Sequence, residues 1–253
     1  MVSAELIEVV GPALVAGLII ACTHAPLGIE VLKRGIIFID LAVAQIAGLG
    51  LVVAGIFLHE PSGWTMQAVA LVFAIGAGLF FRFVETAMPK QLEAIIGCSF
   101  VLAASLALLL LADQPHGGEE IQHLLSGQIL FVTWADVMKH APIYAFIVAV
   151  WFIWPRVREG IGFYLLFAMA ITSSVQLVGV YVVFASLILP ALAATRSKHK
   201  HLTAWACGIV SVMGGILAAT LLDLPAGPVI VVSYVLVAVL FAALRKNHLA
   251  ESQ

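Results

Sequence analysis

The chain has 253 residues and a formal net charge of −2; 63% of its residues are hydrophobic and only 10% are charged. Soluble domains contain about 45–50% apolar and about 25% charged residues, so this composition excludes a soluble globular protein. No basic tail or basic-aromatic pattern indicates a nucleic-acid partner. We therefore expect a multi-pass protein embedded in a lipid bilayer.

Long apolar runs separated by short polar connections predict an all-α fold in which the helices cross the membrane. The expected helices cover about 6–27, 36–58, 64–86, 92–112, 139–154, 161–177, 179–195, 203–222 and 228–244. They should form a single transmembrane domain over residues 1–253, a bundle of eight to nine helices. The number depends on the short polar stretch 173–178, since one of the two helices beside it could be re-entrant or broken.

Basic residues mark every second connection between the predicted helices. Eleven of the twelve Lys and Arg residues lie there, namely Lys33, Arg34, Arg82, Lys90, Arg156, Arg158, three residues within 196–200, Arg245 and Lys246. The other connections carry acidic residues. Since Lys and Arg accumulate on the cytoplasmic side of membrane proteins, the N-terminus should lie outside and the C-terminus inside.

Two polar residues fall within the second predicted helix. Asp40 lies near its start and Gln45 lies deeper. A carboxylate inside a membrane span costs about 3 kcal/mol even on mild insertion scales, so Asp40 should face the bundle interior or a wet cavity. It could line a path for a cation, or it could pair with Arg34 or another basic residue of the inner loops. Gln45 is a candidate for the same path or for a hydrogen bond between helices.

Glu93 and His24 are two further candidates for contact with a metal. Glu93 opens the fourth predicted helix, where a carboxylate interacts favourably with the helix dipole, and this structural role is the preferred interpretation. His24 precedes Ala25 and Pro26 and should lie close to the inner end of the first helix. A hydrogen-bonded histidine at a helix end is preferred there over a metal ligand.

The outer connection 113–123 is dense in imidazole and carboxylate groups. Its candidate ligands are His116, Glu119, Glu120 and His123. Imidazole and carboxylate are ordinary ligands of zinc and also bind manganese and iron. If 119–125 forms a short helix, Glu119 and His123 lie on one face and His116 can close the site. An ordinary solvated loop is an equally good interpretation.

The sequence contains no motif for ATP hydrolysis or for a membrane enzyme. No GxxxxGK[ST] phosphate-binding loop occurs, so this chain does not hydrolyse ATP by that route. No Ser/His/Asp arrangement or HExxH motif indicates a membrane enzyme. The sequence therefore predicts neither ATP hydrolysis by this chain nor a permanently bound cofactor.

An ordered set of motifs resembles the membrane permease subunits of ABC transporters for divalent metals, of the zinc, manganese and iron type. The motifs occupy 24–28, 31–50 with Asp40 and Gln45, 92–97 with Glu93, 115–119, 125–130, 173–179, 182–190 and 223–228. The resemblance covers almost the whole chain. It implies a homodimer of permeases, a cytoplasmic ATP-hydrolysing subunit, an extracytoplasmic metal-binding protein and a site in the prokaryotic cytoplasmic membrane. Members of the family usually have a His near the Asp of the second helix, and Gln45 occupies that region here.

The connection between the fifth and sixth helices departs from the family pattern. Such permeases usually carry a longer cytoplasmic segment there that docks on the ATPase, whereas Pro155 to Gly160 joins the two helices almost directly. A compressed lever with Arg156, Arg158 and Glu159 could do the docking, or the chain could pair with an unusual ATPase, or coupling could be impaired.

The expected function is import of a divalent transition metal, with zinc preferred over manganese or iron. The alternatives are an ABC permease for a metal chelate, an ATP-independent carrier or channel, and a regulatory membrane subunit.

Overall fold

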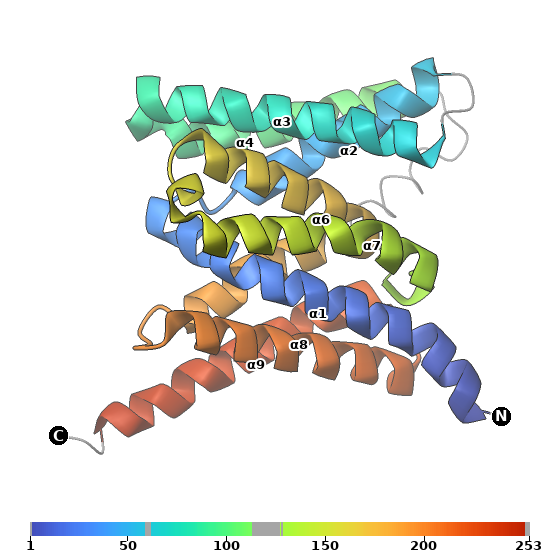
Figure 1. Cartoon of the computed structure of the whole chain (residues 1–253), viewed down its shortest axis with the longest axis vertical. Coiled ribbons are helices and arrows are strands. Elements are labelled where there is room, and N and C mark those ends of the chain that lie inside the picture. Colours follow the sequence, from blue (N-terminus) through green and yellow to red (C-terminus); the bar gives the residue numbers. More distant parts are fainter. Residues whose placement is uncertain (1, 59–61, 113–126, 128, 251–253) are drawn as a thin grey trace.

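The computed structural model describes residues 2–58, 62–112, 127 and 129–250, and these residues are almost wholly helical (Figure 1). The helices are α1 Val2–Arg34, α2 Ile39–Phe57, α3 Gly63–Ala87, α4 Leu92–Leu111, α6 Trp134–Ile153, α7 Ile161–Ala193, α8 Lys200–Leu222 and α9 Ala226–Ala250. Three short 3-10 helices, η1 Pro89–Gln91, η2 Ile129–Phe131 and η3 Pro155–Arg158, lie between them. The described ranges contain no strand, which confirms the all-α prediction.

Eight helices are long and apolar enough to cross a membrane. α1 and α7 are the most buried of them, whereas α4, α6 and α9 turn most of their apolar side chains outward. Large hydrophobic side chains such as Leu109 and Leu236 are accordingly exposed. In a bilayer those surfaces are covered by lipid, so the bundle has an inner pair of helices and an outer shell.

Helix α1 continues seven residues beyond its predicted end. The predicted end lay near residue 27. Pro26 cannot donate a backbone hydrogen bond to the carbonyl of Cys22, which leaves this carbonyl without its usual helical partner. In the structure Trp205 of α8 donates its indole Nε1–H to this Cys22 carbonyl at 2.9 Å. The freed carbonyl is thus satisfied by a neighbouring helix, which lets α1 run through Pro26 to Arg34.

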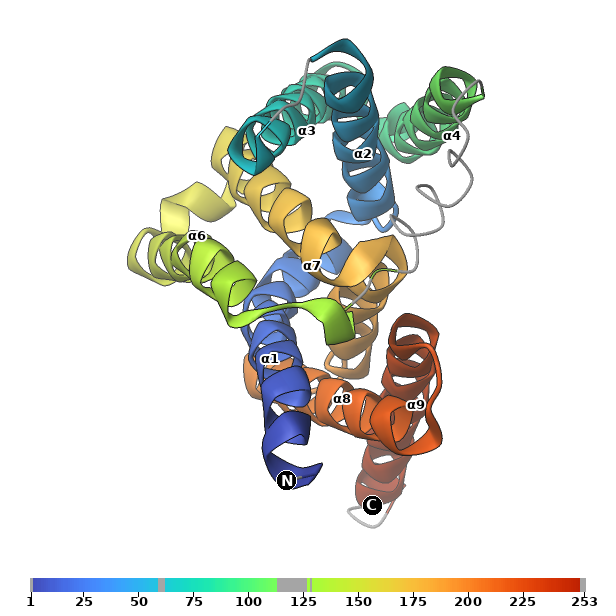
Figure 2. The same ribbon diagram turned by 90° about the vertical axis from the view of Figure 1, so that its right-hand side faces the viewer.

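Helix α7 reverses its direction at Gly179, whose backbone is non-helical (φ 76°, ψ 165°). Ser174 and Ser186 would be about 18 Å apart along a straight helix. Both hydroxyls nevertheless lie within 2.9 Å of the single imidazole ring of His24. α7 is therefore a helical hairpin, with a first leg over 161–178 and a second leg over 180–193 (Figure 2).

Both ends of the α7 hairpin lie at the inner end of α1. Arg34 donates to the Arg158 carbonyl just before the first leg, and a small hollow is lined by Lys33, Thr195 and Lys200. The predicted helices 161–177 and 179–195 thus appear as the two legs, although together they form one of the eight candidate spans. The chain termini lie at opposite ends of the bundle, as the distribution of basic residues predicted (Figure 1).

Candidate functional site

Asp40 is a buried carboxylate at the inner end of α2. It is the second residue of the helix and is 1% exposed. Neither of its carboxylate oxygens has a hydrogen-bond partner among the described residues. An ion pair with Arg34, one of the two interpretations of Asp40, does not form here, because the Arg34 guanidinium bonds Glu30 and Glu85 instead.

Glu93 joins the beginnings of α2 and α4. One of its carboxylate oxygens, Oε1, accepts a hydrogen bond from the backbone N–H of Phe38 at 3.2 Å, directly before α2. Its other oxygen, Oε2, is buried and has no hydrogen-bond partner among the described residues. Glu93 thus makes a structural contact between the two helix beginnings, in addition to its place in the first turn of α4.

A cavity of about 1240 Å³ opens between α2, α4, α7 and α9. Its wall is mostly apolar, and Gln45 of α2 and Tyr181 of the second α7 leg supply polar atoms. Gln45 therefore lines a cavity, and its place on a metal path stays a prediction. Asp40 is not among the lining residues, although the next residue, Leu41, is. The two residues that were predicted to line one path thus occupy different surroundings.

His24 lies in the middle of α1 and not at a helix end, because α1 extends to Arg34. It is fully buried, and each ring nitrogen contacts a hydroxyl: Nδ1 lies 2.7 Å from Ser186 Oγ and Nε2 lies 2.9 Å from Ser174 Oγ. The Tyr144 hydroxyl contacts Ser174 Oγ at 2.8 Å. Both nitrogens that could bind a metal are thus occupied by hydroxyl groups.

Sequence reasoning missed the hydroxyl partners of His24. Next to Ser174, Ser173 contacts His140 Nδ1 at 2.7 Å, which extends the polar region toward the outer half of α6. The signal available was the run 172–174, a Thr and two Ser residues inside an apolar helix. The stretch 173–178 was interpreted as a weak point between two helices, and 173–179 as one of the motifs of the family resemblance, but neither interpretation gave the serines a partner.

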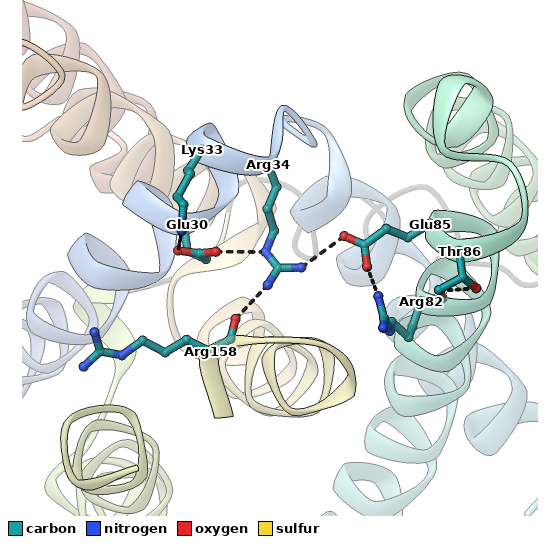
Figure 3. A network of polar contacts seen from close by, with 7 residues as sticks. All are labelled: Glu30, Lys33, Arg34, Arg82, Glu85, Thr86 and Arg158. Carbon is teal, nitrogen blue, oxygen red and sulfur yellow. Dashed lines mark hydrogen bonds and ion pairs between the residues drawn. The ribbon is translucent and has the colours of Figure 1, made fainter. Parts of the chain in front are cut away.

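Four charged side chains form a connected cluster at the inner end of the bundle (Figure 3). The Arg34 guanidinium bonds Glu30 at 3.2 Å within α1 and Glu85 of α3 at 3.1 Å, and Arg82 also pairs with Glu85. Arg34 further donates to the Arg158 carbonyl at 2.7 Å and lies 4.2 Å from the centre of the Phe163 ring. One guanidinium therefore connects α1, α3 and the connection between α6 and α7.

The connection between α6 and α7 is a single turn of 3-10 helix, η3. Arg158 folds back on α6: its Nε donates to the Trp151 carbonyl at 2.9 Å, and its guanidinium lies over the Trp151 ring. Arg156 and Glu159 are exposed. Of the three predicted coupling residues, one thus anchors the turn and two are free to contact a partner.

The outer cluster His116, Glu119, Glu120 and His123 lies outside the described residues, so a metal site there stays a prediction. Within the described part of the chain, no three His, Cys, Asp or Glu side chains gather closely enough to hold a metal ion. Asp40 and Glu93 therefore form at most a two-carboxylate site.

Comparison with known proteins gives a consistent result along the chain. The sequence model of the ABC 3 transport family matches residues 6–159 and 158–245. The high-affinity zinc uptake system membrane protein ZnuB of Haemophilus influenzae is 24% identical over 251 aligned residues, covering 90% of this chain and 94% of that protein.

Two solved structures have a similar fold. PsaBC from Streptococcus pneumoniae, determined in complex with a Fab, matches with a TM-score of 0.75 and 16% identity over 95% of each chain. A metal-chelate type ABC transporter in an inward-facing conformation matches with a TM-score of 0.71 and 16% identity, over 97% of this chain and 89% of that one.

Proposed function

The chain belongs to the ABC 3 transport family, and from this premise we propose that it is the permease subunit that imports a divalent transition metal, zinc, across the prokaryotic cytoplasmic membrane. The family match spans almost the whole chain, and the similarity to a zinc-uptake membrane protein extends over the same length. Manganese and iron are the competing substrates.

The buried carboxylate of Asp40 is the observation that carries the proposal. A charge in an apolar bundle is prohibitive unless something compensates for it. Asp40 has no partner among the described residues, and neither does the second oxygen of Glu93. A dehydrated divalent cation requires such oxygen ligands. Asp40 and Glu93 bind the ion at the inner end of its path, and Gln45 contacts it in the cavity.

Capture of the ion takes place on the outer side. His116, Glu119, Glu120 and His123 attract the cation or receive it from an extracytoplasmic metal-binding protein. Carboxylates at an open mouth raise the local cation concentration over roughly 8–10 Å at ordinary salt. His116→Ala combined with His123→Ala should therefore raise the half-saturating metal concentration more than it lowers the maximal rate of uptake.

A second copy of the chain closes the cavity between α2, α4, α7 and α9. The cavity is partly open, and its mostly apolar wall includes Leu49, Val52 and Val235. Such a wall needs another apolar surface or lipid against it. A homodimer places two of these walls face to face and encloses the path between them.

A cytoplasmic ATPase subunit drives the transport by docking on η3. Two observations support a compressed docking element: the two family matches meet at residues 158–159, and Arg34 fixes η3 to α1 and α3. Movement of η3 would pass through Arg34 to both helices. Arg156→Glu with Glu159→Lys should detach the ATPase, as measured by copurification, while the permease stays inserted. Crosslinks to the ATPase only from 82–90 or 196–201 would contradict docking on η3.

A metal chelate is the alternative substrate, and the size of the cavity favours it. A space of about 1240 Å³ with a mostly apolar wall is far larger than a bare ion needs. Purified transporter in vesicles distinguishes the two substrates, because a chelate permease would take up the complex and not the free metal.

The test of metal import is Asp40→Asn. We expect metal accumulation, measured by elemental analysis of cells, to fall nearly to background at equal membrane abundance of the permease. Asp136→Asn is the matched control, because Asp136 is half-exposed at the outer end of α6 and caps that helix with Thr133. Equal uptake by both variants would assign Asp40 to a structural role. Comparison of zinc, manganese and iron accumulation identifies the substrate.

A further inference from the structure

The polar groups around His24 form one continuous hydrogen-bonded chain across three helices. It runs from Tyr144 of α6 through Ser174 of the first α7 leg and His24 of α1 to Ser186 of the second α7 leg. Ser186 then donates to the backbone carbonyl of Val183 at 2.9 Å. The four side chains are at most 2% exposed, so water does not compete for these bonds.

The direction of every bond follows once the last one is set. Ser186 has a single hydroxyl proton, and both the Val183 carbonyl at 2.9 Å and His24 Nδ1 at 2.7 Å can accept it. When the proton goes to the Val183 carbonyl, the Ser186 oxygen accepts from His24 Nδ1–H. A neutral imidazole with its proton on Nδ1 has a bare Nε2, which accepts from the Ser174 hydroxyl. The Ser174 oxygen in turn accepts from the Tyr144 hydroxyl. Each donor has one acceptor, and the chain is complete without any charge.

His24 is the member of this chain that holds the two α7 legs together. It bonds one serine on each leg, on either side of the reversal at Gly179. Close packing supports the same contact: a Cβ atom at Gly28, one turn further along α1, would lie only 2.0 Å from the Leu187 carbonyl oxygen. The second leg is therefore pressed against α1 near His24.

The opposite side of the second leg forms part of the cavity wall. Tyr181, Phe184 and Ala185 line the cavity, and Ala185 is the immediate neighbour of Ser186. The position of this leg relative to α1 thus sets how far its cavity-facing side chains project.

We propose that His24 is a positioning residue which, as a neutral imidazole protonated on Nδ1, fixes the second α7 leg through Ser174 and Ser186 and so sets the shape of the cavity. In this role His24 binds no metal, because a metal on either nitrogen would displace a serine hydroxyl. The inference concerns the cavity wall and holds for any substrate that passes through it.

The tautomer of His24 is measured by ¹⁵N solid-state NMR on the full chain in lipid bilayers. The His24 signals are assigned by their absence from a His24→Gln sample. We expect a protonated Nδ1 and a bare Nε2, unchanged when zinc is added. An Nε2-protonated ring, an imidazolium or a zinc-shifted signal would overturn the proposal.

The position of the second leg is measured by thiol labelling at the cavity wall. Tyr181→Cys is the reporter, with the exposed Cys22 and Cys98 replaced by Ala. Loss of two hydrogen bonds in His24→Phe should change the rate of reaction with a charged maleimide by about fivefold or more. His24→Gln, whose side-chain oxygen can accept from Ser174, should restore part of the original rate.

Thr23→Val is the matched control. Thr23 is a buried hydroxyl next to His24 on α1, and the one hydrogen bond that it makes within the described part of the chain goes to the Ile19 carbonyl of its own helix. Its removal should leave the labelling rate unchanged. If His24→Phe does not fold, Ser186→Ala serves instead, since it removes the same contact from the α7 side. Equal effects of Thr23→Val and Ser186→Ala, or no effect of Ser186→Ala, would overturn the proposal.

Discussion

The inner end and the middle of the bundle both contain connected polar side chains, but of opposite kinds. At the inner end, Arg34, Glu30, Glu85 and Arg82 carry full charges, and their side chains are 13–35% exposed. In the middle, the chain through His24 is neutral and at most 2% exposed. Charges are retained where water can reach them, whereas polar groups at depth are neutral and matched donor to acceptor.

Asp40 does not follow this pattern. It is as buried as the neutral groups, yet it is a carboxylate without a hydrogen-bond partner among the described residues. Its position in the first turn of α2 offsets part of the cost of its charge through the helix dipole. The contrast with the neutral chain is the reason why Asp40 is proposed to meet the transported cation.

The largest effect on stability is expected from Arg34→Met. The substitution leaves Glu30 and Glu85 half-buried without their guanidinium partner, which should cost about 2–3 kcal/mol of the free energy of unfolding. SDS titration in mixed micelles measures this loss. Adding Glu85→Gln should recover part of it, and a double variant less stable than Arg34→Met would contradict the charge argument.

A smaller loss is expected from Tyr144→Phe in the neutral chain. The variant removes one buried hydroxyl whose partner Ser174 still bonds His24, so the cost should be about 1 kcal/mol. The same titration measures it. A loss as large as that of Arg34→Met would mean that the neutral chain is no weaker than the charged cluster.

The effect of salt on these stability losses should differ between the charged cluster and the neutral chain. Arg82 is 35% exposed, so its ion pair with Glu85 is screened, and Arg82→Gln should cost about 0.5 kcal/mol at low salt and almost nothing at 1 M salt. The loss caused by Tyr144→Phe should be the same at both salt concentrations. Parallel titrations at the two concentrations test the difference directly.

The smallest effect is expected from Lys33→Gln. The Lys33 side chain is 74% exposed and pairs with Glu30 at 3.5 Å, so its removal should change the free energy of unfolding by less than about 0.5 kcal/mol. A clear destabilisation would show that the contact of Lys33 with Glu30 of the charged cluster matters more than the exposure of the Lys33 side chain.

The sequence was sufficient for the fold class and most helix positions, because these depend on local hydropathy. The orientation of the ends in the membrane, which rests on the distribution of Lys and Arg, stays a prediction. The sequence also located the break near residue 178. It was wrong about the end of α1, since the group that compensates for Pro26 is Trp205, 183 residues from the carbonyl it bonds.

The hydrogen-bond partners of His24 could not be predicted from the sequence either, because they also lie far away along the chain. Its two serine partners are 150 and 162 residues away, and nothing in the local pattern at 24–28 points to them. Asp40 and Gln45 could be identified as unusual because a polar residue in an apolar helix is a local signal. Their different surroundings could not be predicted, since the cavity wall is formed by side chains from five helices.

The reversal at Gly179 also bears on how the protein is made. The second α7 leg, 180–193, is about 21 Å long, shorter than the ~30 Å hydrocarbon core, so it is a poor membrane segment when it stands alone. The first leg, at about 27 Å, precedes it on the ribosome. We therefore expect the two legs to enter the bilayer together as a hairpin, after α1 has already placed His24 at the depth where both serines will meet it.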